Sequence, residues 1–429
     1  MVRTIKRILI YTHNSIGIGH AFRTLAVITG IRYHRPEIDF LVVSGTSIPQ
    51  IFLDEGIEVL KLPGIKKDVE TPGSRLKPRH LTTLGTSALM ELRQRLIMDT
   101  LDCFSPDVVM VEHYMGGLMS EAMPLIRRKR AHAGRLDDFA LIHFSRGIFG
   151  GLDHLSSCGK SDQGFDVVSI ARHFDFIYIL EDPENVDFNG EVLGGAPDLQ
   201  HRIHYLGRIT GKTAHELLPR AEVLRRFGLV DRPIVLVTLG RHGPILPMTR
   251  KLMWLVASGR FGQDHQMVFV IDPYLDREIV KTLRKEQASG DVRFLPFTPH
   301  LVDLVNIANL VICRAGYNIV NEVLMTGAPA LVIPEPHPSG EQERRARSIR
   351  ERNIVVASEK EVLEGQVSDT LADFLSRSKA SPGYDFDKYA IGRRMVNDLD
   401  HWMNKGRPVE SQMKSLSENY SLELIQVIS

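Results

Sequence analysis

The sequence predicts an α/β protein with two doubly wound domains, each built on a parallel sheet. Short apolar runs alternate with amphipathic stretches, as expected where strands are buried on both faces and helices connect them. This alternation occurs twice along the chain. A length of 429 residues provides enough material for two or three domains.

The first half contains five apolar runs that we expect to be strands, with four helical stretches between them. The strands are expected at residues 8–12, 39–44, 107–111, 140–144 and 176–180, and the helices at 21–33, 80–104, 117–130 and 165–173. The intervening segments 63–78 and 147–164 are rich in Gly, Pro and charge, which predicts long loops. Such loops are either functional or plain surface insertions.

The second half repeats the pattern. Strands are expected at residues 233–239, 266–271, 292–295, 310–313 and 328–333, and helices at 212–227, 248–258, 275–287, 301–308, 317–325 and 341–352. Gly228 follows the first of these helices as a C-cap.

Fading apolar periodicity around residues 206–213 predicts the seam between the domains. We therefore expect a first domain over residues 1–208 and a second over 209–384. A last helix, 385–404, would follow and could pack back on the first domain, with a polar tail at 405–429.

Composition narrows the functional classes. Lys and Arg number 53 and Asp and Glu 52, for a net charge of +1, so bulk attraction to nucleic acid is absent and no nucleic-acid partner is expected. With 43% apolar residues the chain can bury large cores. Only three cysteines, no apolar run long enough to span a bilayer and no secretion signal predict a cytoplasmic protein.

The first glycine-rich turn, 14–20, follows the opening strand and reads Asn-Ser-Ile-Gly-Ile-Gly-His. Phe22 stands where a dinucleotide fingerprint has its third glycine, so a nicotinamide site is disfavoured. Gly17 and Gly19 would let the backbone approach a ligand closely. His20 would open the next helix, whose positive end favours the neutral imidazole that a general base needs. A purely structural histidine is the alternative.

Two further turns follow strands of the second half. Gly240 and Arg241 lie in the turn 238–244, whose backbone N–H groups could hold a phosphate. The turn at Arg314 and Gly316 leads into a helix that carries Glu322. Backbone donors there suit a diphosphate, and the carboxylate suits sugar hydroxyls, although an ordinary turn and a solvated carboxylate remain open.

These motifs, in this order, resemble the glycosyltransferases of the GT-B fold. The similarity is carried by Gly17-Ile-Gly-His20, by 294–300, by 313–334 with its Arg-Ala-Gly…Glu…Gly-x-Pro-x-Leu-x-x-Pro pattern, and by Glu341-Gln342. The pattern is most similar to the family 28 group, which contains the lipid II-forming N-acetylglucosaminyltransferase and the galactolipid synthases. The resemblance implies two Rossmann-like domains that face each other across a cleft.

The resemblance also implies roles for several residues. Gly316 would lie against the diphosphate of a nucleotide-sugar, and Glu322 would bind its ribose hydroxyls. The base pocket would form around Phe297. Glu341 and Gln342 would read the donor sugar, although the lipid II enzyme has two glutamines there, which leaves the sugar open.

The acceptor side departs from the family pattern. His143 is retained, but Phe144 replaces the acidic residue of the lipid II enzyme, so a different acceptor is expected. Arg146 could bind a phosphate or carboxylate on that acceptor, or could pair with Asp153 or Asp166.

Glu112 and His113 follow the strand at 107–111, so they too would emerge at the cleft. Either could act on the acceptor, or both could make structural hydrogen bonds. No histidine or cysteine spacing typical of a metal site occurs, so no metal and no cofactor is expected.

Together these features predict an inverting, metal-independent transfer from a nucleotide-diphosphate sugar, most simply a UDP-sugar, to a hydroxyl acceptor. His20 is the first candidate for the base, followed by Glu112 and His113. The acceptor could be lipid-linked, a polysaccharide or a metabolite, and an arginine-rich stretch at 344–352 leaves peripheral membrane contact open. The alternatives are a nucleotide-sugar 2-epimerase or hydrolase of the same fold, and a non-catalytic nucleotide-sugar-binding protein.

Overall fold

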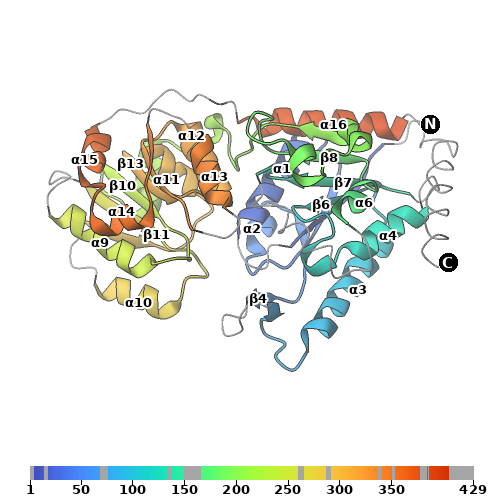
Figure 1. Cartoon of the computed structure of the whole chain (residues 1–429), viewed down its shortest axis with the longest axis horizontal. Helices are drawn as coiled ribbons and strands as arrows, with labels where there is room; N and C mark the ends of the chain where they lie inside the picture. The colour runs from blue at the N-terminus through green and yellow to red at the C-terminus, as the bar shows by residue number, and fades with distance from the viewer. Residues whose placement is uncertain are drawn as a thin grey trace.

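Two parallel sheets, each covered by helices on both faces, form the two halves of the molecule (Figure 1). The computed structural model describes residues 4–13, 18–67, 76–132, 138–148, 166–258, 265–286, 291–336, 340–349, 353–376, 384 and 386–404. Gly17, Asp153, the expected tail 405–429 and most of the expected loop 147–164 lie outside these residues.

The first sheet has seven parallel strands in the order β3-β2-β1-β6-β7-β8-β9. Its strands are β1 (Arg7–Thr12), β2 (Asp39–Ser44), β3 (Glu58–Lys61), β6 (Val108–Glu112), β7 (Ala140–Ser145), β8 (Phe176–Ile179) and β9 (Ile203–Tyr205). The chain order reverses between β1 and β6, and in doubly wound sheets such a switch point opens the ligand-binding crevice.

Helices cover both faces of this sheet. They are α1 (Gly19–His34), α2 (Gln50–Leu53), α3 (Thr86–Phe104), α4 (Met123–His132), α6 (Val167–Ala171), α7 (Phe188–Val192) and the short 3₁₀ helices η1 (Leu118–Ser120) and η2 (Pro197–Arg202). An antiparallel hairpin of β4 (Ile65–Lys67) and β5 (Leu76–Pro78) projects beside α3 (Figure 1).

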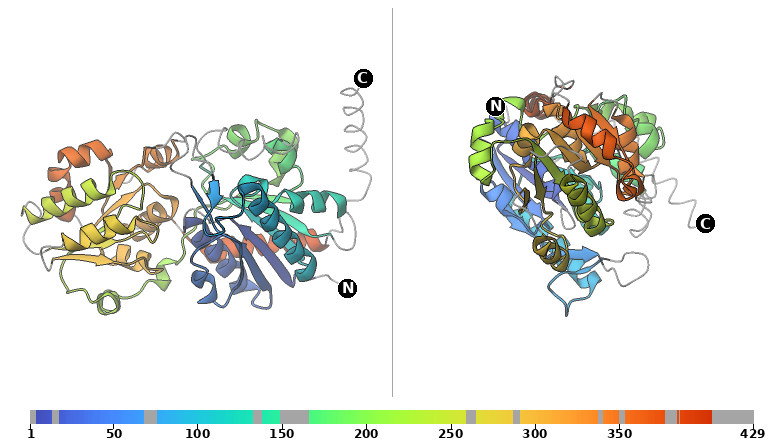
Figure 2. Two further views of the ribbon diagram at one scale, coloured as in Figure 1. Left: turned by 90° about the horizontal axis from the view of Figure 1, so that it is seen from below. Right: turned by 90° about the vertical axis from the view of Figure 1, so that its left-hand side faces the viewer.

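The second sheet has six parallel strands in the order β12-β11-β10-β13-β14-β15. Its strands are β10 (Ile234–Thr238), β11 (Gln266–Val270), β12 (Val292–Leu295), β13 (Leu310–Arg314), β14 (Ala330–Ile333) and β15 (Ile354–Val356). The switch point here lies between β10 and β13. The left view of Figure 2 shows the two halves side by side from below.

The helices of the second half begin with η3 (Ala214–Glu216) and α8 (Arg220–Phe227). They continue with α9 (Ile245–Ala257), α10 (Arg277–Lys285), α11 (Leu301–Ile307), α12 (Tyr317–Thr326), α13 (Glu341–Ser348), α14 (Glu359–Glu364), α15 (Ser368–Ser376) and α16 (Lys388–Asn404). The last of these, α16, runs along the first half of the molecule and packs on α1 (Figure 1). None of the helices described is long and apolar enough to cross a bilayer.

The predicted α/β fold with two parallel-sheet domains is confirmed. Each predicted strand is present to within two residues of its expected ends. They were recognisable because nearly all their residues are buried on both faces.

Three predicted helices are wrong in detail. The one expected at 212–227 is two helices, because Pro219 is the N-cap of α8 and the chain before it is extended. The one at 117–130 is divided by positive φ angles at Gly117, Met119 and Ser120, and the one at 80–104 begins only at Thr86.

Candidate functional site between the two sheets

The switch points of the two sheets supply the polar side chains of the candidate site. In the first sheet, β1 ends before His13, β6 ends in Glu112, and α1 begins with Gly19 and His20. In the second sheet, β13 ends in Arg314 and α12 begins just after Gly316. The site therefore lies where both folds place ligands, at the carboxyl ends of parallel strands.

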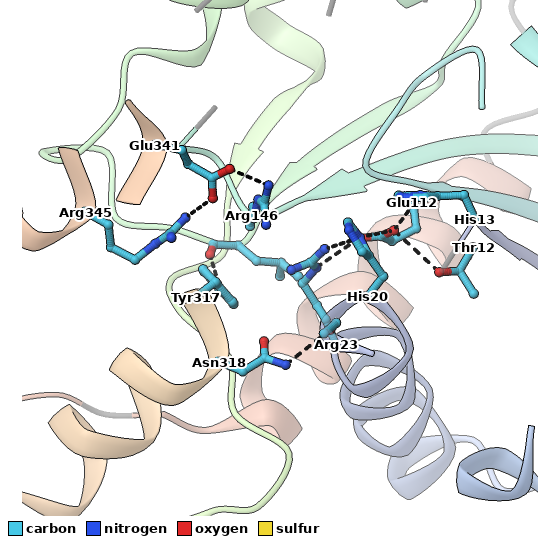
Figure 3. A network of polar contacts seen from close by, with 12 residues as sticks. Thr12, His13, His20, Arg23, Glu112, Arg146, Tyr317, Asn318, Glu341 and Arg345 are labelled. Atoms are coloured by element: carbon cyan, nitrogen blue, oxygen red, sulfur yellow. Dashed lines mark hydrogen bonds and ion pairs between the residues drawn. The ribbon is translucent and has the colours of Figure 1, made fainter. Parts of the chain in front are cut away.

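His20 and Glu112 are in direct contact (Figure 3). The Nδ1 atom of His20 lies 2.8 and 2.9 Å from the two carboxylate oxygens of Glu112. Arg23, one turn further along α1, donates its Nε–H to the same carboxylate at 3.1 Å and also contacts it through Nη2. One fully buried carboxylate therefore receives both an imidazole and a guanidinium.

This contact determines the tautomer of His20. Arg23 Nη2 also lies 2.9 Å from the Nδ1 atom of His20, but that nitrogen cannot accept from Arg23 while it donates to Glu112. Because the carboxylate has no proton of its own to donate, the Nδ1–H must point to Glu112. The lone pair of His20 is then on Nε2, the nitrogen needed by a general base.

The pKa shifts agree with these roles. Burial alone would raise the pKa of Glu112, but the charge of Arg23 and the hydrogen bond from His20 outweigh it and hold that pKa well below its usual range. Burial lowers the pKa of His20, and Glu112 only partly opposes it. Glu112 is thus a permanent anion and His20 a neutral imidazole near pH 7.

His13 and His113 complete a histidine cluster. The ring centroid of His20 lies 4.2 Å from that of His13 and 4.8 Å from that of His113. Burial and neighbouring positive groups lower the pKa of His113 strongly. Its backbone adopts a φ of 68°, a left-handed conformation that is uncommon outside glycine and is found where function requires it.

His13, His20 and Glu112 could also be considered as metal ligands, because their ligand atoms lie within 4.8 Å of one another. However, Arg23 occupies the carboxylate of Glu112 with two of its nitrogens. A divalent cation at this point would face a buried guanidinium. The arrangement therefore fits proton transfer better than metal binding.

The second domain reaches this site through α12. Gly316 is its N-cap and none of the described side chains caps the helix, so its first N–H groups are available to an anion. Tyr317 donates its hydroxyl to the carbonyl of Leu180 at 2.5 Å, and Asn318 donates to the carbonyl of Gly19 at 3.2 Å (Figure 3). These contacts hold the start of α12 against the first domain.

Glu322 lies further along α12 with one carboxylate oxygen, Oε2, lacking a hydrogen-bond partner among the described residues. Burial, assisted by the charge of Asp303, raises its pKa to about 8. Asp303 itself is paired with Lys212 at 2.6 Å and with His300 at 3.2 Å. The Oε2 atom of Glu322 therefore has no hydrogen-bond partner among the described residues, whereas the carboxylate of Asp303 has both Lys212 and His300 as partners.

The remaining predicted donor residues lie on other parts of the second domain. Phe297 packs on Phe22 of α1, with ring centroids 5.8 Å apart. Gly240 has a φ of 66°. Arg241 lies over the ring of Tyr274 at 5.2 Å.

Arg314 points away from the start of α12. Its guanidinium donates to the carbonyls of Leu239 and His242 and pairs with Glu359 at 2.6 Å. It therefore braces the turn around Gly240.

The two predicted acceptor-side residues, His143 and Arg146, lie in different surroundings. His143 is buried against Phe174 and Phe188, and burial lowers its pKa to about 4. Arg146 does not pair with Asp166, which instead caps its own helix, α6. The guanidinium of Arg146 reaches across to the second domain, where it contacts Glu341.

Glu341 and Gln342 begin α13 but point to different partners. The carboxylate of Glu341 lies between Arg146 at 2.5 Å and Arg345 at 2.6 Å (Figure 3). The side-chain amide of Gln342 accepts a hydrogen bond from the backbone N–H of Glu335 at 3.1 Å and donates one to the carboxylate of Glu335 at 3.0 Å.

Sequence reasoning missed His13, Arg23, Tyr317 and Arg345. Arg23 follows His20 by three residues and Arg345 follows Glu341 by four, spacings that bring helical side chains together. That signal was present in the sequence. Tyr317 offered no such signal, because its importance comes from a contact with Leu180, which is distant in the sequence.

Known proteins resemble this chain in sequence and in fold. Residues 254–383 match the glycosyltransferase family 28 C-terminal domain. The chain is a glycosyltransferase. A UDP-N-acetylglucosamine–N-acetylmuramyl-(pentapeptide) pyrophosphoryl-undecaprenol N-acetylglucosamine transferase of Leuconostoc mesenteroides is 22% identical over 366 residues, which cover 83% of this chain and 87% of that protein.

Solved structures show the same fold for the whole glycosyltransferase chain. The MnaA–UDP complex of S. aureus superimposes with a TM-score of 0.61 at 12% identity, covering 93% of this chain and 97% of that one. A glycosyltransferase of kitacinnamycin gives a TM-score of 0.57 at 13% identity, covering 96% and 100%. At these identities the likeness concerns the GT-B fold alone.

Proposed function

We propose that this glycosyltransferase moves a sugar from a UDP-sugar to a hydroxyl acceptor with inversion at the anomeric carbon, and that His20 is the general base. The observation that supports this most directly is the buried contact between His20 and Glu112. The printed name of the Leuconostoc relative, a UDP-N-acetylglucosamine transferase, supports UDP as the nucleotide.

His20 would remove the acceptor proton through Nε2 as the acceptor oxygen attacks the anomeric carbon. Glu112 holds the ring in the required tautomer and stabilises the imidazolium that forms, while Arg23 keeps Glu112 ionised. Glu112 is thus an orienting group in this mechanism. His113 is buried, and its ring centroid lies 4.8 Å from that of His20.

On the donor side, Glu322 would accept hydrogen bonds from the ribose hydroxyls, and the start of α12 would hold the diphosphate. The leaving diphosphate gains negative charge as the glycosidic bond breaks. Helix N-termini and nearby arginines offer positive charge for it, so the mechanism requires no divalent cation. Direct contacts of α12 with the first domain would exclude water from the donor.

The acceptor would be a hydroxyl on a lipid-linked saccharide. The Leuconostoc relative is named for such a substrate, an undecaprenol-linked one, and this supports a lipid-linked acceptor here. An enzyme with such an acceptor would work at a membrane surface. Phe144 at the end of β7 is apolar and fully buried, so the acceptor is expected to differ from that of the relative.

The test compares His20→Ala and Glu112→Gln with the wild type in transfer from UDP-sugars to lipid-linked acceptors. Loss of a general base lowers kcat by about 10²-fold or more, and loss of its orienting carboxylate has a smaller effect in the same direction. His80→Ala, which alters an exposed histidine, serves as the control.

Wild-type turnover by His20→Ala would remove His20 from this role. Incubation of UDP-sugars without acceptor adds a second arm. An epimer or free sugar formed there at the rate of the acceptor reaction would identify a 2-epimerase or hydrolase instead, and binding without any turnover would identify a non-catalytic protein.

A further inference from the structure

One carboxylate at the domain junction lies between two arginines from different domains. Arg146 follows β7 of the first domain and contacts Glu341 Oε2 through Nη2 at 2.5 Å. Arg345, on α13 of the second domain, contacts Glu341 Oε1 through its own Nη2 at 2.6 Å. The two guanidiniums therefore face each other across the width of a single carboxylate (Figure 3).

This triad carries more positive charge than its carboxylate neutralises. Two guanidiniums and one carboxylate leave a formal charge of +1, and the side chains of Arg146, Arg345 and Glu341 are only 21%, 3% and 14% exposed. A charge of that kind away from water is costly unless another group compensates it. Nε of Arg146 and Nε of Arg345 are both buried without an acceptor among the described residues.

The positive, N-terminal end of helix α12 lies close to these arginines. Arg345 donates through Nη1 to the carbonyl of Ala315 at 2.8 Å, and the next residue, Gly316, is the uncapped N-cap of α12. Its guanidinium also lies 5.8 Å from the ring centre of Tyr317. The cationic side chains and the free backbone donors of α12 thus converge on one region.

We propose that Arg146 and Arg345 form a phosphate-binding subsite at the domain junction, in which Glu341 holds the place of the ligand. A phosphate group with two negative charges balances both arginines, whereas the carboxylate balances only one. The phosphate oxygens can also accept hydrogen bonds from the Nε–H groups of Arg146 and Arg345, which Glu341 does not contact. On binding, the phosphate displaces Glu341 and frees this carboxylate for sugar hydroxyls.

The phosphate could belong to the diphosphate of the donor or to a phosphate on the acceptor. Only this assignment rests on the proposed function, because the subsite itself is defined by its affinity for phosphate. Binding can be measured without turnover, so a failed transfer assay and a failed subsite give different results.

The experiment measures binding of inorganic pyrophosphate to the full chain by calorimetry. Arg146→Gln and Arg345→Gln each weaken binding by about 10- to 100-fold, the loss expected for a charge-assisted hydrogen bond. Glu341→Gln tightens binding, because the internal competitor has lost its charge. A residue with a merely structural role would not produce tighter binding.

Two arms separate the sources of the phosphate. If it comes from the donor, Arg146→Gln weakens UDP but leaves uridine unchanged. If it comes from the acceptor, UDP-saturated protein still binds inorganic phosphate, and Arg146→Gln abolishes this. Arg347→Gln, on the exposed side of α13, is the matched control and leaves every affinity unchanged.

Arg345 is almost fully buried, so Arg345→Gln could disturb folding, and thermal unfolding is recorded for each variant. Glu341→Gln then decides the matter. Pyrophosphate affinity that is unchanged or weaker in folded Glu341→Gln, together with wild-type affinities for pyrophosphate, UDP and phosphate in folded Arg146→Gln, would overturn the proposal.

Discussion

At the scale of single residues, two glutamates on opposite sides of the junction show how environment sets a role. Glu112 is fully buried, yet its pKa is held low because Arg23 and His20 stabilise the anion. Among the described residues Glu322 has no comparable cation, so burial raises its pKa to about 8. The first suits a permanent partner of a base, and the second suits a carboxylate that becomes fully ionised only when a ligand supplies hydrogen bonds.

This difference predicts a pH-dependent donor affinity. Below about pH 8 Glu322 carries a proton, which it must lose to accept two ribose hydroxyls. Binding therefore releases a proton, and affinity for a UDP-sugar should rise with pH until about 8 and then level off. Calorimetry between pH 6 and 9, in buffers of different ionisation enthalpy, measures both the affinity and the proton release.

The variant Glu322→Gln should bind the UDP-sugar more weakly at pH 8 and lose the pH dependence below it. Glu364→Gln, an exposed carboxylate of the same domain, is the control and should keep both. A wild-type affinity that does not change with pH, or a Glu322→Gln variant with the same slope, would contradict the assignment of Glu322 to the ribose.

The sequence was sufficient to bring His20 and Glu112 to one edge of the sheet, because both lie at the carboxyl ends of strands that a parallel sheet aligns there. The sequence was not sufficient to predict the hydrogen bond between His20 and Glu112. That depends on strand order, which places β6 beside β1 although other elements lie between them in sequence. The partner of Arg146 was missed for a related reason, since Glu341 belongs to the other domain and lies 195 positions away.

At the scale of secondary structure, the crossing of α1 and α16 depends on two glycines. A Cβ added at Gly392 would lie 2.1 Å from the carbonyl carbon of Gly30, and one at Gly30 would lie 2.3 Å from the carbonyl oxygen of Lys388. Backbone atoms cannot move aside as a flexible side chain can. Small residues at this crossing are therefore what allow the last helix to lie directly on the first.

The variant Gly392→Ala should destabilise the protein. Overpacking of this kind costs typically about 1–3 kcal/mol, and at the midpoint of unfolding this lowers Tm by several degrees. Arg393→Ala changes the adjacent exposed residue of the same helix and should leave Tm almost unchanged. Equal Tm values for Gly392→Ala and the wild type would mean that the two helices do not approach this closely.

The strands of the two sheets that the sequence did not predict share a physical cause. The strands β3, β9 and β15 are short edge or near-edge strands with partly exposed residues, so they lack the continuous apolar run that marked the central strands. The β4–β5 hairpin lies in a segment rich in Lys, Pro and Gly. Its packing against α3 and neighbouring loops, which the sequence does not encode locally, stabilises it.

At the scale of the whole molecule, polar contacts around the site connect the domains. Besides Arg146 with Glu341 and α12 with the first domain, Arg344 of α13 pairs with Glu191 of α7 and donates to the carbonyl of Asn185 at 3.0 Å. The contacts of Arg344 come from α13, the helix that also carries Glu341. Closure of the domains and placement of the donor-side carboxylate are thereby coupled.

A variant of Arg344 tests whether the contact of α13 with the first domain affects closure of the domains over the donor or the chemical step. In Arg344→Ala, α13 loses one of its two described anchors on the first domain but keeps the other, the contact of Glu341 with Arg146. The pair of Arg344 and Glu191 is partly exposed, so its loss should cost about 0.2–1 kcal/mol and raise the KM for the UDP-sugar by up to about fivefold, with kcat nearly unchanged. Arg347→Ala removes an exposed arginine from the same helix and should alter neither constant. Equal KM values for both variants, or a fall in kcat for Arg344→Ala alone, would show that this contact does not act through domain closure.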